Sequence, residues 1–523
     1  MSGDRPVGAL VDLGTNSVRL VIARLEEDGS HVIVKQEKIP VNLGEGSFEN
    51  HLLTQEAMDR TFEALKSMKE TAGFFGAGYI RAVATSALRQ ADNKNLFLKR
   101  VLDELDLDLK VIPGLEEARL VYRGVALNVG EEAEPSLIMD IGGGSVELIV
   151  KGPDSYLELD SLPLGAARLT AVLGPKDRSG RVSGDLYHSM TSFVRDRTSI
   201  FTSKAKKYGL KVCHGCAGVL ENLARLEARR QGRSEKLQKF PPVEAKNLKE
   251  LGLWLGDMTL EERRKVKGLD REKAPIIVTG CAIVQAILDE LSVKTLEVVD
   301  FGLKHGLVYD FIDHYFPPAS QNRTREESIR QLGRRCLFDE AHGEMVARAS
   351  VILYDALAAG GLLEKRASER EMLYLGGLVH DAGKFLAYEN HQLHSWYLIK
   401  NATILGFDED EIDLLAFLAL SHRGGKRQKF ADIYELYEKS DRLDYRRFQA
   451  LGLIAAMAEI LESRRQGALM SAEFQTSKDR VDLLLRIRPG AKMDQEAALL
   501  AKTAKRFQLV FGQPFGGAAV LSH

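Results

Sequence analysis

Cysteine is scarce in this chain, with four residues in 523. So few cysteines exclude a disulfide framework, and a chain of this length can bury enough apolar surface without one. We therefore expect a reducing compartment, the cytoplasm. Cys213 and Cys216 have the spacing of half a zinc site, but no second cysteine pair exists to complete it. An ordinary segment leading from a strand into a loop is the favoured interpretation.

Long apolar runs and an excess of one charge are also missing. The N-terminus, MSGDRPVGALVDLG, has no apolar stretch behind a basic segment, and no run is long enough to cross a bilayer. We expect neither secretion nor membrane insertion. The 72 Lys and Arg residues balance 74 Asp and Glu residues, which gives a net charge of −2. An anionic partner must therefore be bound by local basic patches.

The length predicts two to four domains, and the pattern of elements changes at Pro317 and Pro318. Before them, short β-branched segments alternate with amphipathic helical patterns, which is typical of an α/β fold. After them, helical patterns follow one another to about Ser463. RVDLLLRIRPG is the only convincing strand beyond that point, and one more helix is expected from about Asp494. The final GQPFGGAAVLSH has no interpretable pattern.

Two segments repeat one pattern: VDLGTNSVRLVI near the N-terminus and MDIGGGSVELIV from residue 139. Each has an apolar strand, an Asp, a tight glycine turn with a hydroxyl residue, and a second apolar strand. The repeat indicates two related lobes facing a cleft, although two ordinary β-hairpins are the alternative. Glycine turns let backbone N–H groups approach phosphate oxygens. Asp12 and Asp140 can reach a divalent cation such as Mg²⁺ directly or through its waters.

The glycine turns, DLGTNS and DIGGGS, resemble the phosphate loops of the actin, heat-shock chaperone and sugar-kinase superfamily, and HGCAGVLENLA resembles a third such loop. Within that superfamily the chain is similar to the exopolyphosphatase and guanosine pentaphosphate phosphatase family, up to about Ser463. The segments that carry the similarity are, in order, VATSALRQADN, GLEEARLVYRGV, SLPLGAARLT, VKGLDREKAPIIVTG, LVHDAGK and HSWYLIKN.

The resemblance implies an α/β fold with a two-lobed, actin-like (ribonuclease H-like) phosphatase module. An all-α HD-like domain and a small α+β C-terminal extension are expected to follow. We expect lobe I at residues 1–127, lobe II at 128–316, the HD-like domain at 317–468 and the extension at 469–523. The implied reaction is Mg²⁺-dependent removal of terminal phosphate from inorganic polyphosphate, or conversion of guanosine pentaphosphate to the tetraphosphate. The resemblance also implies a homodimer, and no sequence-specific binding of nucleic acid.

The catalytic glutamate of the family maps to Glu116 and Glu117 in GLEEAR, near the start of an expected helix. Neighbouring residues lie about 100° apart around a helix, so the pair is not expected to share one role. We favour Glu117 as general base, with Glu116 as the fallback. The alternative is that both are solvated charges at a helix N-terminus, where carboxylates are stabilised in any case.

The remaining residues of the expected cleft are predicted to bind metal or phosphate. Asp140 is the expected metal ligand, Glu147 its helper across the turn, and Asp12 the counterpart on the other lobe. An outward-facing strand position is the alternative for Glu147. Arg suits phosphate because its planar fork contacts two oxygens at once. The expected phosphate-binding residues are Gly14, Thr15, Asn16, Ser17, Arg19, Arg89, Gly142, Gly143, Gly144, Ser145, Gly215 and Gly218.

Two segments depart from the family pattern. FGLKHG has Lys304 and His305 where Arg and then Glu are expected, and CAG continues to Val219 where the family often ends in Gly-Thr. Both lie where a nucleoside binds in kinases of this fold. The departures weaken any prediction of guanosine recognition.

The helical region contains a second group of candidate metal ligands. It resembles the HD phosphohydrolase fold, in which an adjacent His-Asp pair, distant histidines and a final Asp bind one or two divalent metals. Here the last ligand is a Glu, and a decayed site with packed or solvent-facing histidines is the alternative. The residues are His342, His380, Asp381, His394, His422 and Glu459.

Basic segments offer a hypothetical track for a long polyanion, provided that they align in space. Solvated surface charges are the alternative. The basic residues are Lys204, Lys206, Lys207, Arg263, Arg264, Lys265, Lys267, Arg423, Lys426, Arg427 and Lys429.

The favoured function is exopolyphosphatase, with guanosine pentaphosphate phosphatase as the close alternative. A nucleotide-binding switch or sugar kinase is more remote, because carboxylates in GLEEAR suit a water nucleophile better than a sugar. A third possibility makes the HD-like domain the working enzyme and the first half a phosphate sensor.

Overall fold

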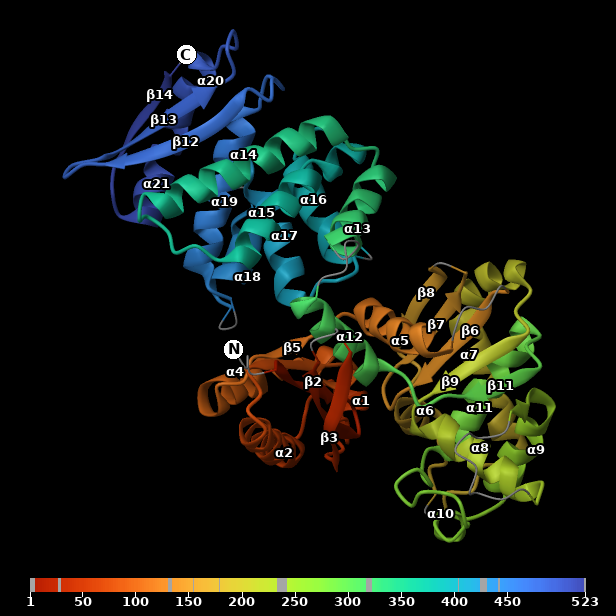
Figure 1. The fold of residues 1–523 in the computed structure, drawn as a ribbon. Helices are drawn as coiled ribbons and strands as arrows, with labels where there is room; N and C mark the ends of the chain where they lie inside the picture. The colour runs from red at the N-terminus through yellow and green to blue at the C-terminus, as the bar shows by residue number, and fades with distance from the viewer. Residues whose placement is uncertain are drawn as a thin grey trace. The chain divides into compact units, whose positions relative to one another are not determined.

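The computed structural model describes residues 5–26, 30–129, 134–153, 155–177, 179–232, 242–316, 322–402, 404–423, 430–440 and 443–521. The chain divides into two compact units, Met1–Ala319 and Ser320–His523 (Figure 1). Pro317 and Pro318, where the fold class was expected to change, lie outside the described residues. The finer boundaries between lobes stay predictions.

The first unit begins with a five-stranded sheet in the order β3-β2-β1-β4-β5. The β1–β2 hairpin is antiparallel, and β4 and β5 continue the sheet in parallel with β1. Helix α2 begins after Thr54, whose side chain caps it by accepting a hydrogen bond from the Ala57 amide. The strands are β1 (Val7–Leu13), β2 (Ser17–Leu25), β3 (His31–Pro40), β4 (Tyr79–Ala84) and β5 (Leu109–Val111).

A six-stranded sheet in the order β10-β11-β9-β6-β7-β8 forms the second lobe. Its β6–β7 hairpin is antiparallel and lies beside the parallel strand β9, as β1–β2 lies beside β4. The two glycine turns therefore occupy equivalent places in the two sheets. The strands are β6 (Ser136–Ile141), β7 (Val146–Lys151), β8 (Tyr156–Leu162), β9 (Val212–Cys216), β10 (Val243–Glu244) and β11 (Thr295–Val298).

Helices surround both sheets, and α11 is the most completely buried of them, which fits its nearly unbroken apolar sequence. The helices of the first unit are α1 (Ser47–Asn50), α2 (Gln55–Phe74), α3 (Ser86–Arg89), α4 (Lys94–Leu105), α5 (Gly114–Val129), α6 (Ala166–Leu173), α7 (Gly184–Ala205), η1 (Lys206–Tyr208), α8 (Gly218–Arg230), α9 (Ala245–Gly256), α10 (Leu260–Arg263), α11 (Ile277–Leu291) and α12 (Leu303–Tyr315).

Helices α5 and α12 pack with their backbones in contact. A Cβ atom on Gly124 would lie 2.1 Å from the Gly302 carbonyl oxygen, and one on Gly306 would lie 2.1 Å from the Leu120 carbonyl oxygen. A buried ion pair joins the same two helices, with Arg119 of α5 contacting Asp310 of α12 at 3.2 Å. Since α12 follows the second lobe and α5 carries the candidate base, this contact fixes α5 between the lobes.

The second unit is mainly helical, as predicted. Its helices are α13 (Asn322–Arg335), α14 (Glu340–Ala359), α15 (Ala367–Val379), η2 (Ala382–Phe385), α16 (His391–Asn401), α17 (Glu409–Ser421), α18 (Ala431–Glu438), α19 (Tyr445–Leu461), α20 (Asp494–Leu499), η4 (Leu500–Thr503) and α21 (Ala504–Phe511).

The prediction of a single strand in this unit is wrong. Three strands form one sheet, in which β13 (Val481–Ile487) lies between β12 (Leu469–Thr476) and β14 (Phe515–Leu521). β12 is mostly exposed and lacks an apolar alternation, and β14 begins with Phe515 followed by two glycines. The buried face of this sheet shares one hydrophobic core with the helices, through residues such as Phe474 and Leu483.

Within the described residues, no helix is both long and apolar enough to cross a membrane.

Candidate functional site

A pocket of about 90 Å³ lies where the two glycine turns face each other. The turns approach closely: a Cβ atom on Gly144 would lie 2.5 Å from Ser86 Oγ, and one on Gly143 would lie 2.9 Å from Asn16 Nδ2. Side chains at these glycines would therefore close the pocket. Its lining includes Asp12, Gly14, Thr15, Asn16, Ser17, Arg19, Thr85, Ser86, Glu117, Asp140, Gly142, Gly143, Gly144, Ser145, Gly218 and Lys273.

Both turns close in the same way. The Gly14 amide donates to the Ser17 carbonyl at 3.0 Å, and the Gly142 amide donates to the Ser145 carbonyl at 3.0 Å. A third segment reaches the pocket at Gly218, where α8 begins. Helix N-termini favour anions because their first N–H groups and the helix dipole both point toward the ligand. Three backbone segments of a kind that can bind an anion therefore border the pocket.

Three carboxylates converge on this pocket from different strands and helices. Burial, together with the charge of Glu117, raises the pKa of Asp12 to about 7 and the pKa of Asp140 to about 6. Buried carboxylates in such a group are stabilised by a divalent cation, which prefers oxygen ligands. The chemistry of this donor set fits Mg²⁺, with Asp140 and Asp12 as the residues to hold it.

Glu117 extends from the first turn of α5 into the pocket and is 8% exposed. Arg89 Nη1 donates to Glu117 Oε2 at 3.1 Å and to the Ile112 carbonyl at 2.9 Å. Burial raises the pKa of Glu117, while Arg89 and the Thr85 hydroxyl lower it. The carboxylate is thus both basic and held in one orientation.

Glu116 lies on another side of α5 and does not line the pocket. Arg119 donates to both of its oxygens, at 2.7 Å from Nε and 2.8 Å from Nη2. The same guanidinium contacts Asp310 at 3.2 Å. This geometry favours Glu117 over Glu116 as the base.

Other predicted residues lie near the pocket without lining it. Glu147 is paired with Asp140 in the β6–β7 register and accepts a hydrogen bond from Ser161 Oγ at 2.8 Å. Burial and the charge of Glu117 raise its pKa well above the usual range. Gly215 is inside β9, where a Cβ atom would meet Leu296 and Leu220. Glu147 therefore lies behind the pocket, and Gly215 is a packing position.

Sequence reasoning missed Lys273, which lines the pocket opposite the glycine turns. Burial lowers its pKa. The residue lies in VKGLDREKAPIIVTG, a segment that carries the family resemblance, and a lysine before a buried helix was the available signal.

A second cavity of about 300 Å³ adjoins the pocket and shares Arg19, Asp140 and Lys273 with it. Lys304 lines this cavity and is paired with Asp300 at 3.0 Å. His305 does not line it; its ring packs on Phe301, with ring centres 5.1 Å apart, and burial lowers its pKa to about 4. The remaining charged residues of the lining are Glu37, Lys38, Glu221 and Asp270.

The four cysteines are free and buried. Cys213 and Cys216 lie in β9, and the Cys216 thiol contacts the Met139 carbonyl at 3.6 Å. These two residues are part of the second lobe's sheet, in agreement with the favoured strand-to-loop interpretation.

The basic track is only partly consistent with the structure. Arg263 is buried, and its side chain donates to the Gly180 carbonyl, so its assignment to a surface track is wrong. Lys206 and Lys207 are exposed but paired with Glu290 and Glu158. Lys426, Arg427 and Lys429 lie outside the described residues.

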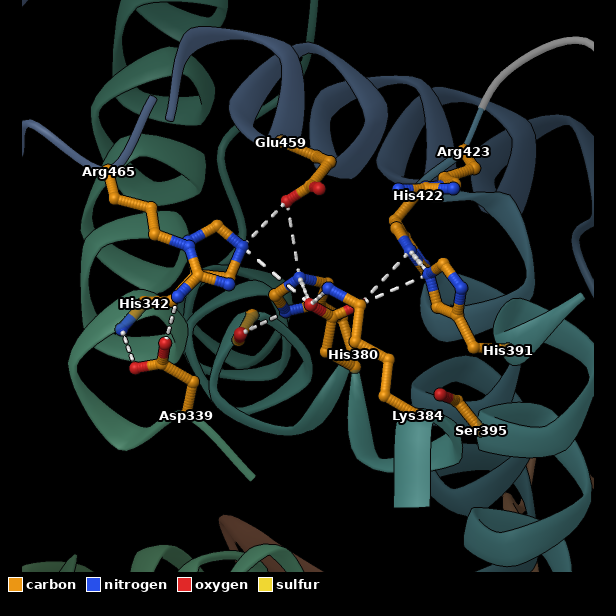
Figure 2. A network of polar contacts seen from close by, with 12 residues as sticks. Asp339, His342, His380, Lys384, His391, Ser395, His422, Arg423, Glu459 and Arg465 are labelled. Carbon is orange, nitrogen blue, oxygen red and sulfur yellow. Dashed lines mark hydrogen bonds and ion pairs between the residues drawn. The ribbon is translucent and has the colours of Figure 1, made fainter. Parts of the chain in front are cut away.

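The second predicted group of ligands comes together in the helical unit, with one correction. Figure 2 shows His342, His380, His422 and Glu459 facing one another. Asp381 belongs to the same group, with its Oδ2 3.5 Å from His380 Nε2. His391, which the sequence analysis did not select, also belongs to this group: its Nε2 lies 3.2 Å from Asp381 Oδ1. His394 makes no such contact among the described residues. One helical turn separates the two histidines, and only the first faces inward.

Comparisons with known proteins identify the family of the chain. Residues 21–315 match the Ppx/GppA phosphatase family, and residues 324–505 match domain III of Ppx/GppA phosphatases. The chain is 28% identical to an exopolyphosphatase from Cytophaga hutchinsonii of known structure, with a TM-score of 0.55 over 59% of this chain and 98% of that one.

Two further solved structures are similar. A Ppx/GppA family member from Aquifex aeolicus is 26% identical, with a TM-score of 0.49 over 59% of this chain and 98% of that one. An exopolyphosphatase-like protein is 22% identical, with a TM-score of 0.54 over 60% of this chain and 100% of that one.

Proposed function

Because this chain belongs to the Ppx/GppA phosphatase family, we propose that it is an exopolyphosphatase, which hydrolyses the terminal phosphoanhydride bond of inorganic polyphosphate with Mg²⁺ or another divalent cation. Its first unit has the mixed α/β, actin-like fold of that family. The observation that carries the proposal is the position of Glu117. This buried carboxylate is oriented by Arg89 and lies in a pocket rimmed by two glycine turns.

Each part of the pocket has a role in such a reaction. The glycine turns, Arg19 and Lys273 bind phosphate oxygens and hold the terminal phosphoryl group in place. Mg²⁺, when bound at Asp140 and Asp12, supplies positive charge that stabilises the transition state. Glu117 orients the attacking water and accepts its proton. Phosphoryl transfer depends mainly on this combination of positioning and electrostatic stabilisation.

The environment of Glu117 suits a general base. A base is most effective when its pKa lies near the working pH, because it is then ionised and still basic. Burial raises the pKa of Glu117, and Arg89 opposes this effect and keeps the ionised form accessible. Glu116 lacks this balance, because Arg119 occupies both of its oxygens.

Guanosine pentaphosphate is a second candidate substrate, favoured by the cavity beside the pocket. Its lining has four cationic side chains against five carboxylates: Arg19, Lys38, Lys273 and Lys304 against Glu37, Asp140, Glu221, Asp270 and Asp300. Such a balance of charges does not attract a continuing polyanion. Carboxylates and the Phe301 ring instead offer acceptors and an apolar edge to a purine base. The departures from the family pattern at Lys304 and His305 argue in the other direction.

The proposal also places the protein in the cytoplasm and makes it a homodimer. Four buried free cysteines are compatible with a reducing compartment. Light scattering on the purified chain measures the oligomeric state directly.

The first experiment measures phosphate release from long-chain polyphosphate and from guanosine pentaphosphate, with Mg²⁺ and then with EDTA. We expect release only with the divalent cation, and the faster substrate identifies the enzyme. Glu117→Gln keeps the shape of the side chain and should lower kcat by about 10²- to 10⁴-fold, the usual contribution of a general base.

Glu116→Gln tests the fallback residue in the same assay. It should lower stability by loosening the contact with Arg119, while the folded fraction keeps its turnover. Loss of turnover in Glu116→Gln with normal turnover in Glu117→Gln would reverse the assignment. Saturable ATP binding without phosphate release from any substrate would instead favour the nucleotide-binding switch.

A further inference from the structure

The first turn of α6 packs directly behind the second glycine turn, residues 142–145. A Cβ atom on Gly165, the residue before α6, would lie 2.3 Å from the carbonyl carbon of Gly143. All three glycine carbonyls of the turn accept hydrogen bonds from this side. The pairs are the Ala166 amide with Gly142 at 3.0 Å, the Ala167 amide with Gly143 at 2.9 Å, and Arg168 Nε with Gly144 at 2.9 Å.

These hydrogen bonds fix the direction in which the amides of the turn point. The peptides are trans, so the carbonyl of one residue and the N–H of the next point in opposite directions. With the carbonyls held against α6, the N–H groups of Gly143, Gly144 and Ser145 point away from it. All three residues line the pocket, and within the described part of the chain none of their amides donates to another backbone carbonyl. These amides are therefore available to a ligand in the pocket.

Arg168 differs from the other two donors because its side chain also reaches the part of the chain that forms the first sheet. Its Nη2 donates to Gln90 Oε1. Its guanidinium lies over the ring of Phe48, with Cζ 4.6 Å from the ring centre. Gln90 ends α3, and Phe48 lies in α1. One guanidinium thus joins the second glycine turn to two elements of the other lobe.

Phe48 in turn lies behind the first glycine turn, residues 14–17. The Gly44 amide donates to the Thr15 carbonyl at 3.0 Å, so this turn too has a carbonyl held from behind. A Cβ atom on Gly44 would lie 2.5 Å from Thr15 Cγ2 and 3.0 Å from Phe48 Cζ. The contact between Arg168 and Phe48 therefore connects the segments that support the two turns.

The position of Arg168 argues against direct contact with phosphate. It does not line the pocket, and two of its three nitrogens are bonded to Gly144 and Gln90. Burial and the nearby charge of Arg89 lower the pKa of Arg168, so a cation at this place costs free energy. The contacts that join the two lobes offset this cost.

We propose that Arg168 is a positioning residue, which holds the second glycine turn against the first lobe with the amides of the turn directed at the terminal phosphoryl group. This inference rests on the proposed function, since the amides act on a phosphate. A planar guanidinium makes several hydrogen bonds in a fixed geometry, whereas the ammonium group of lysine is a compact point charge. Lysine at this position would keep the positive charge and lose the connection.

The experiment compares Arg168→Lys with the wild type in steady-state phosphate release, on whichever of the two candidate substrates the wild type hydrolyses faster. We expect KM to rise and kcat/KM to fall by about 10²-fold, the cost of displacing a catalytic group by about 1 Å. The rise in KM is the decisive readout. Partial unfolding lowers kcat but leaves KM unchanged, because the folded molecules still bind substrate normally.

Arg197→Lys is the matched control. Arg197 also lies over a phenylalanine ring, that of Phe193, with Cζ 5.1 Å from the ring centre. It is exposed on α7 and does not line the pocket. Its KM and kcat should equal those of the wild type.

Gln90→Met removes the acceptor from the other side of the connection and tests the proposal even where Arg168→Lys fails to fold. Alone it should raise KM, by less than Arg168→Lys does, because the bond to Gly144 remains. The double variant should be no worse than Arg168→Lys, since both substitutions break the same connection.

The outcomes separate this role from the proposed function. Wild-type kinetics in Arg168→Lys, or a lower kcat at unchanged KM, would overturn the positioning role while leaving the phosphatase assignment intact. Fully additive losses in the double variant with Gln90→Met would overturn it as well. A wild type that releases no phosphate from either substrate would instead refute the proposed function, and this role with it.

Discussion

Glu116 and Glu117 are neighbours in the chain but have different electrostatic surroundings. Glu117 faces a pocket where burial raises its pKa, and Arg89 is its cationic partner. Glu116 faces the side of α5 that is bonded to α12 through Arg119 and Asp310. The turn of about 100° between adjacent helical residues is therefore enough to separate a candidate catalytic group from a structural one.

Arg89 should act as a positioning residue for Glu117. Arg89→Gln removes the charge that lowers the pKa of Glu117, so this pKa rises further. Because the base must be ionised, the acidic limb of the kcat–pH profile should move to higher pH. Each unit of that movement lowers turnover about tenfold at pH values below the limb. Phosphate release measured from about pH 5 to about pH 9 gives this profile.

Arg100→Gln is the control for that variant. Arg100 also pairs with a carboxylate, Glu104, but both side chains lie on the surface of α4, away from the pocket. Its pH profile should match that of the wild type. An Arg89→Gln profile that is lower at every pH without moving along the pH axis would contradict the role in setting the pKa and leave only a structural contribution.

Individual residues were predictable from sequence where a motif fixes the backbone around them. Asp12, Asp140 and the glycines follow from a strand and a tight turn, and they line the pocket as expected. His391 and His394 show the limit. Both lie in one short segment, and their directions depend on where α16 begins, which Asn390 sets with a positive φ of 57°. Helical periodicity without a known starting residue does not choose between them.

At the scale of elements, the strength of the amphipathic pattern decided what could be predicted. The hairpins β1–β2 and β6–β7 are apolar and punctuated by glycine, and α2 has both an amphipathic pattern and a cap. The edge strands β12 and β14 could not be predicted in this way, because most of their side chains are exposed or half-buried. Their formation depends on pairing with β13, which is a tertiary interaction.

The contact between α5 and α12 should tolerate no side chain at Gly124. Gly124→Ala places a methyl group where the Gly302 carbonyl lies, and this neighbour is backbone and cannot rotate away. We expect a loss of about 1–3 kcal/mol in the free energy of unfolding, as for overpacked cores. Turnover should also fall, because α5 carries Glu117. Urea denaturation and phosphate release on the same preparation measure both effects.

Gly73→Ala is the matched control, because the added methyl group would contact no neighbouring atom. Gly73 lies in α2, and a Cβ atom there would have nothing within 4 Å. Alanine is the better helix former, so stability should rise by roughly 0.5–1 kcal/mol. If Gly124→Ala were as stable as the wild type, the backbone contact between α5 and α12 would not be needed to hold the candidate base.

At the scale of the whole molecule, each hydrophobic core lies within one of the two units, which divide between residues 319 and 320. One core draws on residues from Ile329 to Phe515, and the others draw on residues from Ala9 to Phe311. Separate cores are the physical basis of separate cooperative units. The sequence predicted this division from the change in element pattern alone, since helices without strands cannot extend an α/β sheet.

The two units should therefore unfold in separate calorimetric transitions, each responding to its own core. Phe311→Ala creates a cavity in the first unit, and Phe417→Ala creates one in the second, where Phe417 packs against Tyr437 with ring centres 5.0 Å apart. Each substitution should cost about 3–5 kcal/mol and lower only one transition. A single transition lowered equally by both variants would show that the units unfold together.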